Sequence, residues 1–72
     1  MSEFVETREI IERIKDIMSN ERDGFIYDKD VAIELQIPNS TLRFAIYKNR
    51  IPYMEISKFC YKRKLIINDI IF

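Results

Sequence analysis

The sequence predicts an all-α protein, a compact bundle of about five short helices that contains a helix-turn-helix. Three observations support this class. Apolar residues recur at three- and four-residue steps through most of the chain. The single glycine and two prolines lie between these periodic segments and argue against a disordered chain. A chain of 72 residues makes one domain with one modest core, since a protein of this size buries only about 60% of its unfolded surface.

The first predicted helix covers residues 3–19, within an N-terminal segment 1–19, and has Ser2 as its N-cap. Its opposite face alternates Glu with Arg and Lys, which is typical of a solvated helix surface and also suits a dimer contact. The apolar stripe is made by Phe4, Ile10 or Ile11, Ile14, and Ile17 or Met18.

A loop is expected over residues 20–27, with Gly24 as its hinge. It ends in Phe25, Ile26 and Tyr27, a short apolar segment that we call the clasp. The sequence leaves two possibilities for the clasp: an extended segment held against the core, or the beginning of the next helix.

Residues 28–49 predict the helix-turn-helix. Asp28 is the expected N-cap of a helix that runs from Lys29 to Gln36, and Pro38 fits the first turn of a second helix that ends at Lys48 or Asn49. A small residue allows the two helices to cross closely, and apolar residues flank the turn and occupy the centre of the second helix. These residues are Ala32, Leu35, Ile37 and Leu42. In DNA-binding proteins, the second helix of such a pair enters the major groove.

The outer face of the 38–49 helix is expected to read DNA bases. Asn pairs with adenine, Arg pairs with guanine, and an aromatic ring contacts a thymine methyl group. The base-reading candidates are Asn39, Ser40, Arg43, Phe44 and Tyr47. Helix capping alone would also explain Asn39 and Ser40, and Arg43 has the ordinary explanation of a solvated charge. Phe44 either packs under the clasp, the favoured alternative, or belongs to an interface.

The C-terminal region, residues 52–72, predicts a helix over residues 52–63 and a final apolar segment. The inner stripe of the helix is expected to contain Tyr53, Ile56, Phe59 and Cys60, with Cys60 as a buried thiol. Basic side chains at its end favour a solvated terminus over a phosphate clamp; they are Lys58, Lys62, Arg63 and Lys64. The apolar segment from Leu65 to Phe72 is expected to complete the core and to touch a second copy of the chain.

Charge is distributed unevenly although the net charge is zero. Residues 1–34 contain ten acidic and five basic side chains, a net charge of −5. Residues 35–72 contain seven basic and two acidic side chains, a net charge of +5. The positive half includes the second helix of the predicted pair, as expected for a small protein that binds DNA phosphates.

The segment DKDVAIELQIPNSTLRFAIYKNRIPYMEISKFCYKRK resembles the DNA-binding domain of phage repressors in the lambda-repressor-like helix-turn-helix superfamily. The similarity covers residues 28–64 and is most specific in KNRIPYMEI, residues 48–56, with a weaker echo in the closing IINDIIF. Two positions depart from the family pattern. Gln36 replaces the usual glycine, so either Gln36 has a positive φ or the turn is remodelled. Asp69 replaces an aromatic residue, which affects the packing of the last helix.

The resemblance implies a sequence-specific transcriptional regulator, most simply a phage-type repressor, that binds double-stranded DNA as a homodimer. Thr41, Lys48 and Arg50 would contact phosphates. An enzyme is not expected, because the chain has no His, no Gly-rich phosphate loop and no cluster of metal ligands. We therefore expect no cofactor, no metal and no small-molecule substrate, and a cytoplasmic protein without a membrane span. The competing prediction is a protein-interaction module of the same fold that has no DNA affinity.

Overall fold

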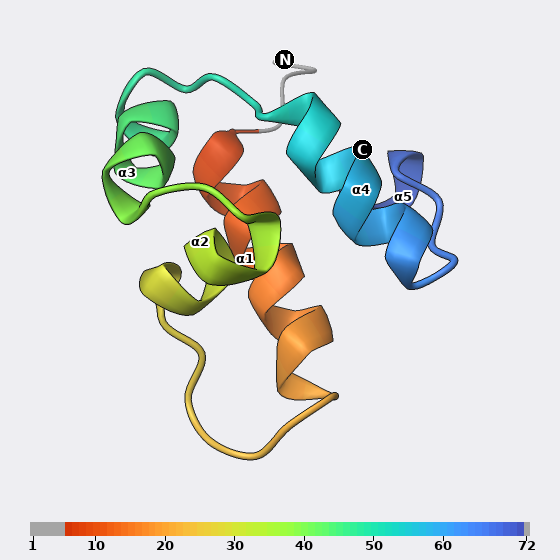
Figure 1. The fold of residues 1–72 in the computed structure, drawn as a ribbon. Helices are drawn as coiled ribbons and strands as arrows, with labels where there is room; N and C mark the ends of the chain where they lie inside the picture. Colours follow the sequence, from red (N-terminus) through yellow and green to blue (C-terminus); the bar gives the residue numbers. More distant parts are fainter. Residues whose placement is uncertain (1–5, 72) are drawn as a thin grey trace.

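The computed structural model describes residues 6–71, and within that range every regular element is a helix. The five helices are α1 (Thr7–Ser19), α2 (Asp28–Leu35), α3 (Asn39–Tyr47), α4 (Tyr53–Lys62) and α5 (Asn68–Ile71). Helix α1 contacts α2, α3 and α5, and α2 also contacts α3 and α4 (Figure 1). The prediction of an all-α protein with about five short helices is confirmed. Predicted roles for Ser2, Phe4 and Phe72 concern residues outside the described range.

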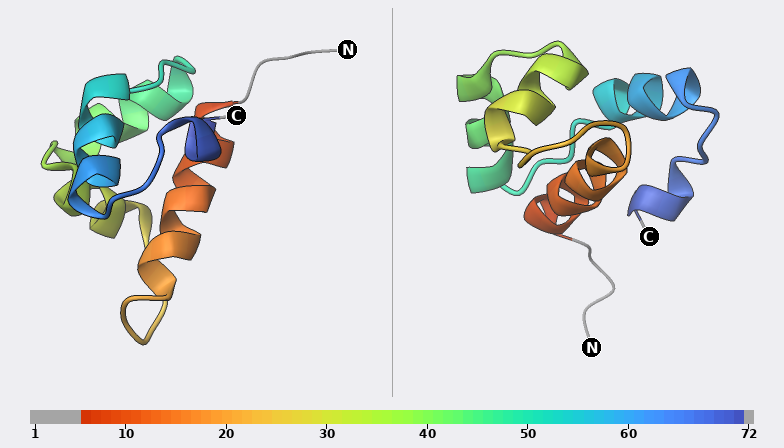
Figure 2. Two further views of the ribbon diagram at one scale, coloured as in Figure 1. Left: turned by 90° about the vertical axis from the view of Figure 1, so that its right-hand side faces the viewer. Right: turned by 90° about the horizontal axis from the view of Figure 1, so that it is seen from below.

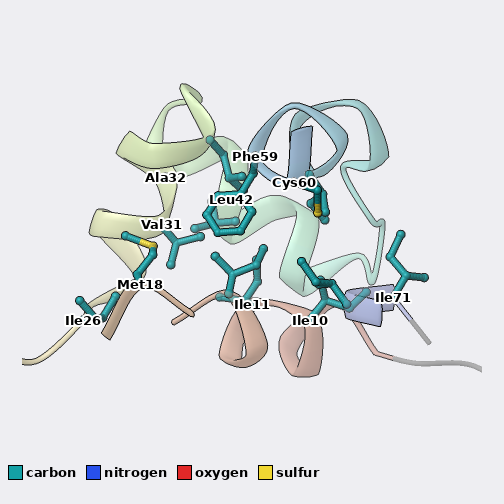
Figure 3. Packing of buried hydrophobic residues seen from close by; sticks show 14 residues of the cluster. Ile10, Ile11, Met18, Ile26, Val31, Ala32, Leu42, Phe59, Cys60 and Ile71 are labelled. Atoms are coloured by element: carbon teal, nitrogen blue, oxygen red, sulfur yellow. The ribbon is translucent and has the colours of Figure 1, made fainter. Parts of the chain in front are cut away.

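The core lies where α1 faces the other helices. Ile10, Ile11 and Ile14 of α1 are fully buried, so both alternatives at positions 10 and 11 face inward. Figure 3 shows Ile11 pointing toward Leu42 of α3 and Phe59 of α4, and Ile10 pointing toward Cys60 of α4. One continuous cluster therefore holds the helices together; it also includes Met18, Ile26, Val31, Ala32, Leu35, Ile56, Cys60, Ile70 and Ile71.

Helix α1 begins later than predicted. Glu6 has extended backbone angles, with φ −73° and ψ 147°, so the helical segment begins at Thr7. The side chain of Glu6 makes no capping hydrogen bond to the helix. The cap comes instead from a distant residue, Asn49, whose side-chain oxygen accepts a hydrogen bond from the N–H of Thr7 at 2.8 Å. The prediction that residue 6 is helical is therefore wrong, and the predicted start at residue 3 lies outside the described residues.

The clasp adopts the extended alternative. Ile26 is buried in the core, whereas Phe25 and Tyr27 are exposed on either side of it. Tyr27, and not Asp28, occupies the N-cap position of α2, because Tyr27 is extended and Asp28 is already helical. The Asp30 carboxylate accepts a hydrogen bond from the N–H of Tyr27 at 2.8 Å, which fixes this start. Gly24 adopts φ +99° in the preceding loop, which projects beyond the end of α1 (Figure 2).

The three residues 36–38 join α2 to α3. Gln36 adopts a left-handed conformation with φ 61° and ψ 41°, so a non-glycine residue takes the positive φ that the turn needs. The N–H of Ile37 then donates to the carbonyl of Ala32 at 3.0 Å, which closes the end of α2 as in a Schellman motif. Pro38 directly precedes α3 and has the extended angles of an N-cap residue.

Helix α4 buries Ile56, Phe59 and Cys60, as predicted. Tyr53 was assigned to the same stripe from its spacing to Ile56 and Cys60, but it is the first residue of the helix and is 56% exposed, so this assignment is wrong. Burial raises the pKa of the Cys60 thiol and outweighs the opposite effect of the nearby Arg63 charge. The thiol therefore has the character of a core group.

The last segment packs on α1. Helix α5 lies beside α1 (Figure 2). Ile70 and Ile71 of α5 are buried, and the Arg13 guanidinium of α1 donates to the carbonyl of Ile70 at 2.5 Å. This confirms that the apolar segment completes the core. In the segment between α4 and α5, by contrast, Leu65 and Ile66 remain exposed and do not contribute to the core.

Candidate nucleic-acid interface

Helix α3 presents one polar and aromatic face to solvent. Its inner residues, Leu42 and Ala45, are buried, and this fixes the rotation of the helix. The structure leaves all eight predicted DNA-contacting residues exposed: Asn39, Ser40, Thr41, Arg43, Phe44, Tyr47, Lys48 and Arg50. The predicted set is thus accessible as a group on α3 and the turn that follows it.

Phe44 does not pack under the clasp. It is 53% exposed, and the clasp residues pair with each other instead, with the Phe25 and Tyr27 ring centroids 4.8 Å apart in an edge-to-face arrangement. The Lys48 ammonium lies 6.0 Å from the Phe44 ring centroid and 5.5 Å from that of Tyr47. The favoured alternative for Phe44 is therefore wrong, and its ring joins an exposed aromatic and cationic cluster.

A groove of about 720 Å³ runs beside α3, between that helix and the clasp. Three predicted base readers form one wall: Asn39, Arg43 and Tyr47. The opposite wall contains residues that the sequence prediction did not include in the site, namely Phe25, Tyr27 and Lys29. Their signal was present in the sequence, because exposed aromatic residues next to a lysine are typical of nucleic-acid surfaces, but the clasp was interpreted only as a packing element.

Ion pairs connect the charged residues at the floor of the groove. The Asp28 carboxylate lies 2.6 Å from the Lys15 ammonium and 3.2 Å from the Arg8 guanidinium. Partial burial raises the pKa of Asp28, but the hydrogen bonds and charges of Lys15 and Arg8 outweigh it, so its pKa lies below the ordinary value. For Lys15, burial lowers the pKa, but Asp28 and Glu12 outweigh this effect and raise it. Asp28 and Lys15 are therefore both charged at neutral pH.

Positive charge near α3 is left uncompensated. Within residues 6–71, six basic side chains lie within 4.0 Å of a carboxylate: Arg8, Arg13, Lys15, Arg22, Lys62 and Arg63. The other basic side chains form no such pair among the described residues: Lys29, Arg43, Lys48, Arg50, Lys58 and Lys64. Three of these six belong to the predicted interface and a fourth, Lys29, lines the groove beside it. The excess of positive charge that the sequence predicts for residues 35–72 is thus strongest at α3.

Arg63 has a different role from the other bases near the end of α4. Its guanidinium lies 2.6 Å from the Glu21 carboxylate and 2.8 Å from that of Glu34, and it stacks 4.0 Å from the Phe59 ring centroid. Its side chain is only 16% exposed. The prediction that placed Arg63 in a solvated cluster is wrong, because two carboxylates and a ring enclose it.

Asn49 is a site-supporting residue that the sequence prediction missed. It has a positive φ of 52°, and the N–H of Arg50 donates back to the carbonyl of Ala45 at 2.8 Å, which ends α3. Its side-chain oxygen accepts the hydrogen bond from the N–H of Thr7 described above. These bonds fix the backbone between Lys48 and Arg50. No local pattern signals this role, since the partner lies 42 residues earlier.

Other kinds of site find little support in residues 6–71. This range contains no group of three or more His, Cys, Asp or Glu side chains that could hold a metal ion. In the same range, none of the helices combines the length and the apolar character needed to cross a bilayer.

No protein-family model, curated protein or solved structure matches the chain. The resemblance to phage repressors stays a prediction from the sequence. What the chain binds must be inferred from its own surface.

Proposed function

We propose that the chain is a sequence-specific DNA-binding regulator of the phage-repressor type that places α3 in the major groove. One observation carries the proposal: all eight predicted contact residues are exposed on or directly after α3, and its basic residues have no carboxylate partner among the described residues. Helix α2 supports α3 across a three-residue turn, which is the order of elements in a helix-turn-helix. The buried Ala32 and Leu42 suit a close crossing of the two helices.

Sequence would be read by the exposed face of α3. Asn39 and Arg43 lie on the same wall of the groove and have the hydrogen-bonding groups that suit adenine and guanine. Ser40 lies one residue along, where its hydroxyl can pair with a base edge or with a phosphate. Phe44 and Tyr47 offer apolar rings that suit thymine methyl groups.

Phosphate contacts would position the helix without specifying sequence. Thr41 contributes a hydroxyl near the start of α3, and Lys48 and Arg50 contribute charge at its end. The Lys48 ammonium lies over the Phe44 and Tyr47 rings, so it is partly held in place before DNA arrives. Each phosphate that Lys48 or Arg50 neutralises releases counterions from DNA, so the affinity should fall steeply with salt.

A homodimer is part of the proposal. A single small module contributes few contacts and binds DNA weakly, whereas two copies place their recognition helices in successive major grooves, about 34 Å apart. Leu65 and Ile66, exposed between α4 and α5, are the candidates for the contact between the copies. A regulator of this kind works in the cytoplasm.

The alternative function is a protein-interaction module that uses the same face. The exposure of Phe44 and Tyr47 favours it, because aromatic residues are enriched in protein interfaces. The uncompensated bases at α3 favour DNA. Binding to a protein through apolar rings would change little with salt, and this distinguishes the two functions.

The test is a comparison of two double variants in selection from a pool of duplex DNA. Asn39→Ala with Arg43→Ala should abolish sequence preference. The control, Ser57→Ala with Lys58→Ala, also removes one polar and one basic side chain from an exposed helix face, and it should select the same sites as the wild type. Equal selection by both double variants would contradict the proposal.

A further inference from the structure

The outer face of α4 carries apolar side chains that neither the core nor the proposed DNA contact uses. Met54 is 69% exposed and Tyr61 is 87% exposed. They are seven residues apart, so they lie on one face of the helix, about 10 Å apart along its axis. This face is opposite to the one that buries Ile56, Phe59 and Cys60. Large apolar side chains that are aligned and exposed mark an interaction surface.

A shallow groove of about 520 Å³ lies on this face, lined by Met54, Ser57, Lys58, Tyr61 and Lys62. We call it the α4 groove. The thioether and the phenol ring are its apolar groups, and the aliphatic stems of the two lysines can cover the sides while their ammonium groups reach water. Tyr and Met are both enriched in protein interfaces, and Tyr is frequent among the residues that contribute most of the binding energy.

The charge around the α4 groove selects its partner. None of its five lining residues is acidic. Lys58 has no carboxylate within 4.0 Å among the described residues. The Lys62 ammonium is 4.0 Å from the Glu34 carboxylate, a long distance for an ion pair, and 66% of the Lys62 side chain is exposed. Glu34 and Glu55 line a small cavity on the adjoining side of α4, to which Lys58 and Lys62 also contribute. An occupant therefore meets an apolar strip bordered by positive charge.

We propose that the α4 groove binds an amphipathic helical segment of another protein, with apolar residues on one face and carboxylates beside them. Apolar anchors at positions i, i+3 or i+4, and i+7 match the spacing of Met54 and Tyr61. Glutamates flanking those anchors would pair with Lys58 and Lys62. The surface would let a DNA-bound regulator contact a second protein, but the binding itself does not depend on DNA.

Two other occupants fit the groove less well. A second copy of the chain, paired about a two-fold axis, would bring Lys58 and Lys62 of one copy against the same lysines of the other, and like charges at an interface are unfavourable. A DNA backbone would satisfy the lysines but would leave Met54 and Tyr61 without an apolar partner. An acidic amphipathic segment satisfies both kinds of group.

The test uses a fluorescent synthetic peptide of about 16 residues, designed as a helix with Leu at the anchor spacing and Glu beside it. A matched peptide carries Lys in place of each Glu. We expect saturable binding of the acidic peptide only. Tyr61→Ala and Met54→Ala should each weaken it about tenfold or more. Tyr47→Ala, which removes an equally exposed tyrosine from α3, should leave it unchanged.

Three results would overturn the proposal: no binding of the acidic peptide, equal binding of both peptides, or no effect of Tyr61→Ala. Sedimentation of the protein without peptide adds a further arm, since self-association that Tyr61→Ala abolishes would assign the groove to a second copy. DNA binding by the same variants is measured separately. Loss of peptide binding and loss of DNA binding are therefore distinguishable failures.

Discussion

The side-chain oxygen of Asn49 accepts two hydrogen bonds from Thr7, one from the backbone N–H at 2.8 Å and one from the hydroxyl at 2.9 Å. Thr7 is the first residue of α1 and is fully buried. The first N–H groups of a helix have no partner within it, so they need an acceptor from elsewhere. The turn after α3 supplies that acceptor and links the predicted DNA-contacting helix to the central helix of the bundle.

Replacing Asn49 by Ala should lower the free energy of unfolding by about 1–3 kcal/mol, because two buried donors of Thr7 lose their acceptor. Asn49→Asp is the matched control. It retains an acceptor oxygen at a helix N-terminus, where negative charge is favourable, and should stay close to the wild type. Urea unfolding measures both variants. Equal losses of stability would show that the acceptor is not what matters.

Three successive helices, α2 to α4, are each followed within two residues by a non-glycine residue with positive φ: Gln36, Asn49 and Lys64. Glycine adopts this conformation without the clash that a Cβ atom causes. Gln36→Gly and Lys64→Gly should therefore each raise the free energy of unfolding by about 0.5–1 kcal/mol. Asn49→Gly should lower it, because relief of strain is smaller than the loss of the bonds to Thr7. A stabilised Asn49→Gly protein would contradict this ranking of the two effects.

The sequence predicted the helical class, the inward isoleucines of α1 and the accessibility of the interface residues other than Phe44, for which burial under the clasp was favoured. These features follow from local periodicity, because a residue three or four positions from a buried one shares its helix face. Gln36 shows the same logic at a turn. The resembled family has glycine at this position, which left two alternatives for Gln36, and the positive φ is the one observed.

Features that depend on distant partners were missed. Asn49 was interpreted only as part of a helix end, since nothing near it in the sequence points to Thr7. Arg63 was grouped with solvated lysines because its charge type suggests water, whereas Glu21 and Glu34 come together around it only in the folded chain. Whether the Phe44 ring is buried or exposed also depends on tertiary structure. The clasp and α3 lie on opposite walls of a groove, so the clasp does not cover the Phe44 ring.

The ion pairs of Asp28 predict a loss of stability in acid. Its pKa is lowered in the folded state, so its contribution is fully present above the ordinary pKa of about 3.8 and is lost as the pH falls through the lower folded value. Asp28→Asn should cost about 1 kcal/mol at pH 7, and its difference from the wild type should shrink below about pH 4. Asp23→Asn, in the exposed loop, is the control and should change little. A difference that persists unchanged at low pH would exclude the carboxylate charge as its source.

Arg63→Met should destabilise the protein by about 1–3 kcal/mol, because it leaves the Glu21 and Glu34 carboxylates without their main partner. Met keeps much of the contact with Phe59, so the loss reports mainly on charge. Lys62→Met changes a neighbouring base whose side chain is 66% exposed, and it should have an effect near zero. Thermal unfolding of the two variants measures the contrast. Similar melting temperatures would place Arg63 among the ordinary surface charges.

The most direct test of the proposed function is titration of the protein into random-sequence duplex DNA at two salt concentrations, with recovery and sequencing of the bound fraction. We expect binding that weakens steeply with salt and enrichment of a two-fold symmetric site whose half-sites lie about one helical turn apart. Absence of binding at low salt would contradict the account, and the exposed rings of α3 would then belong to a protein interface.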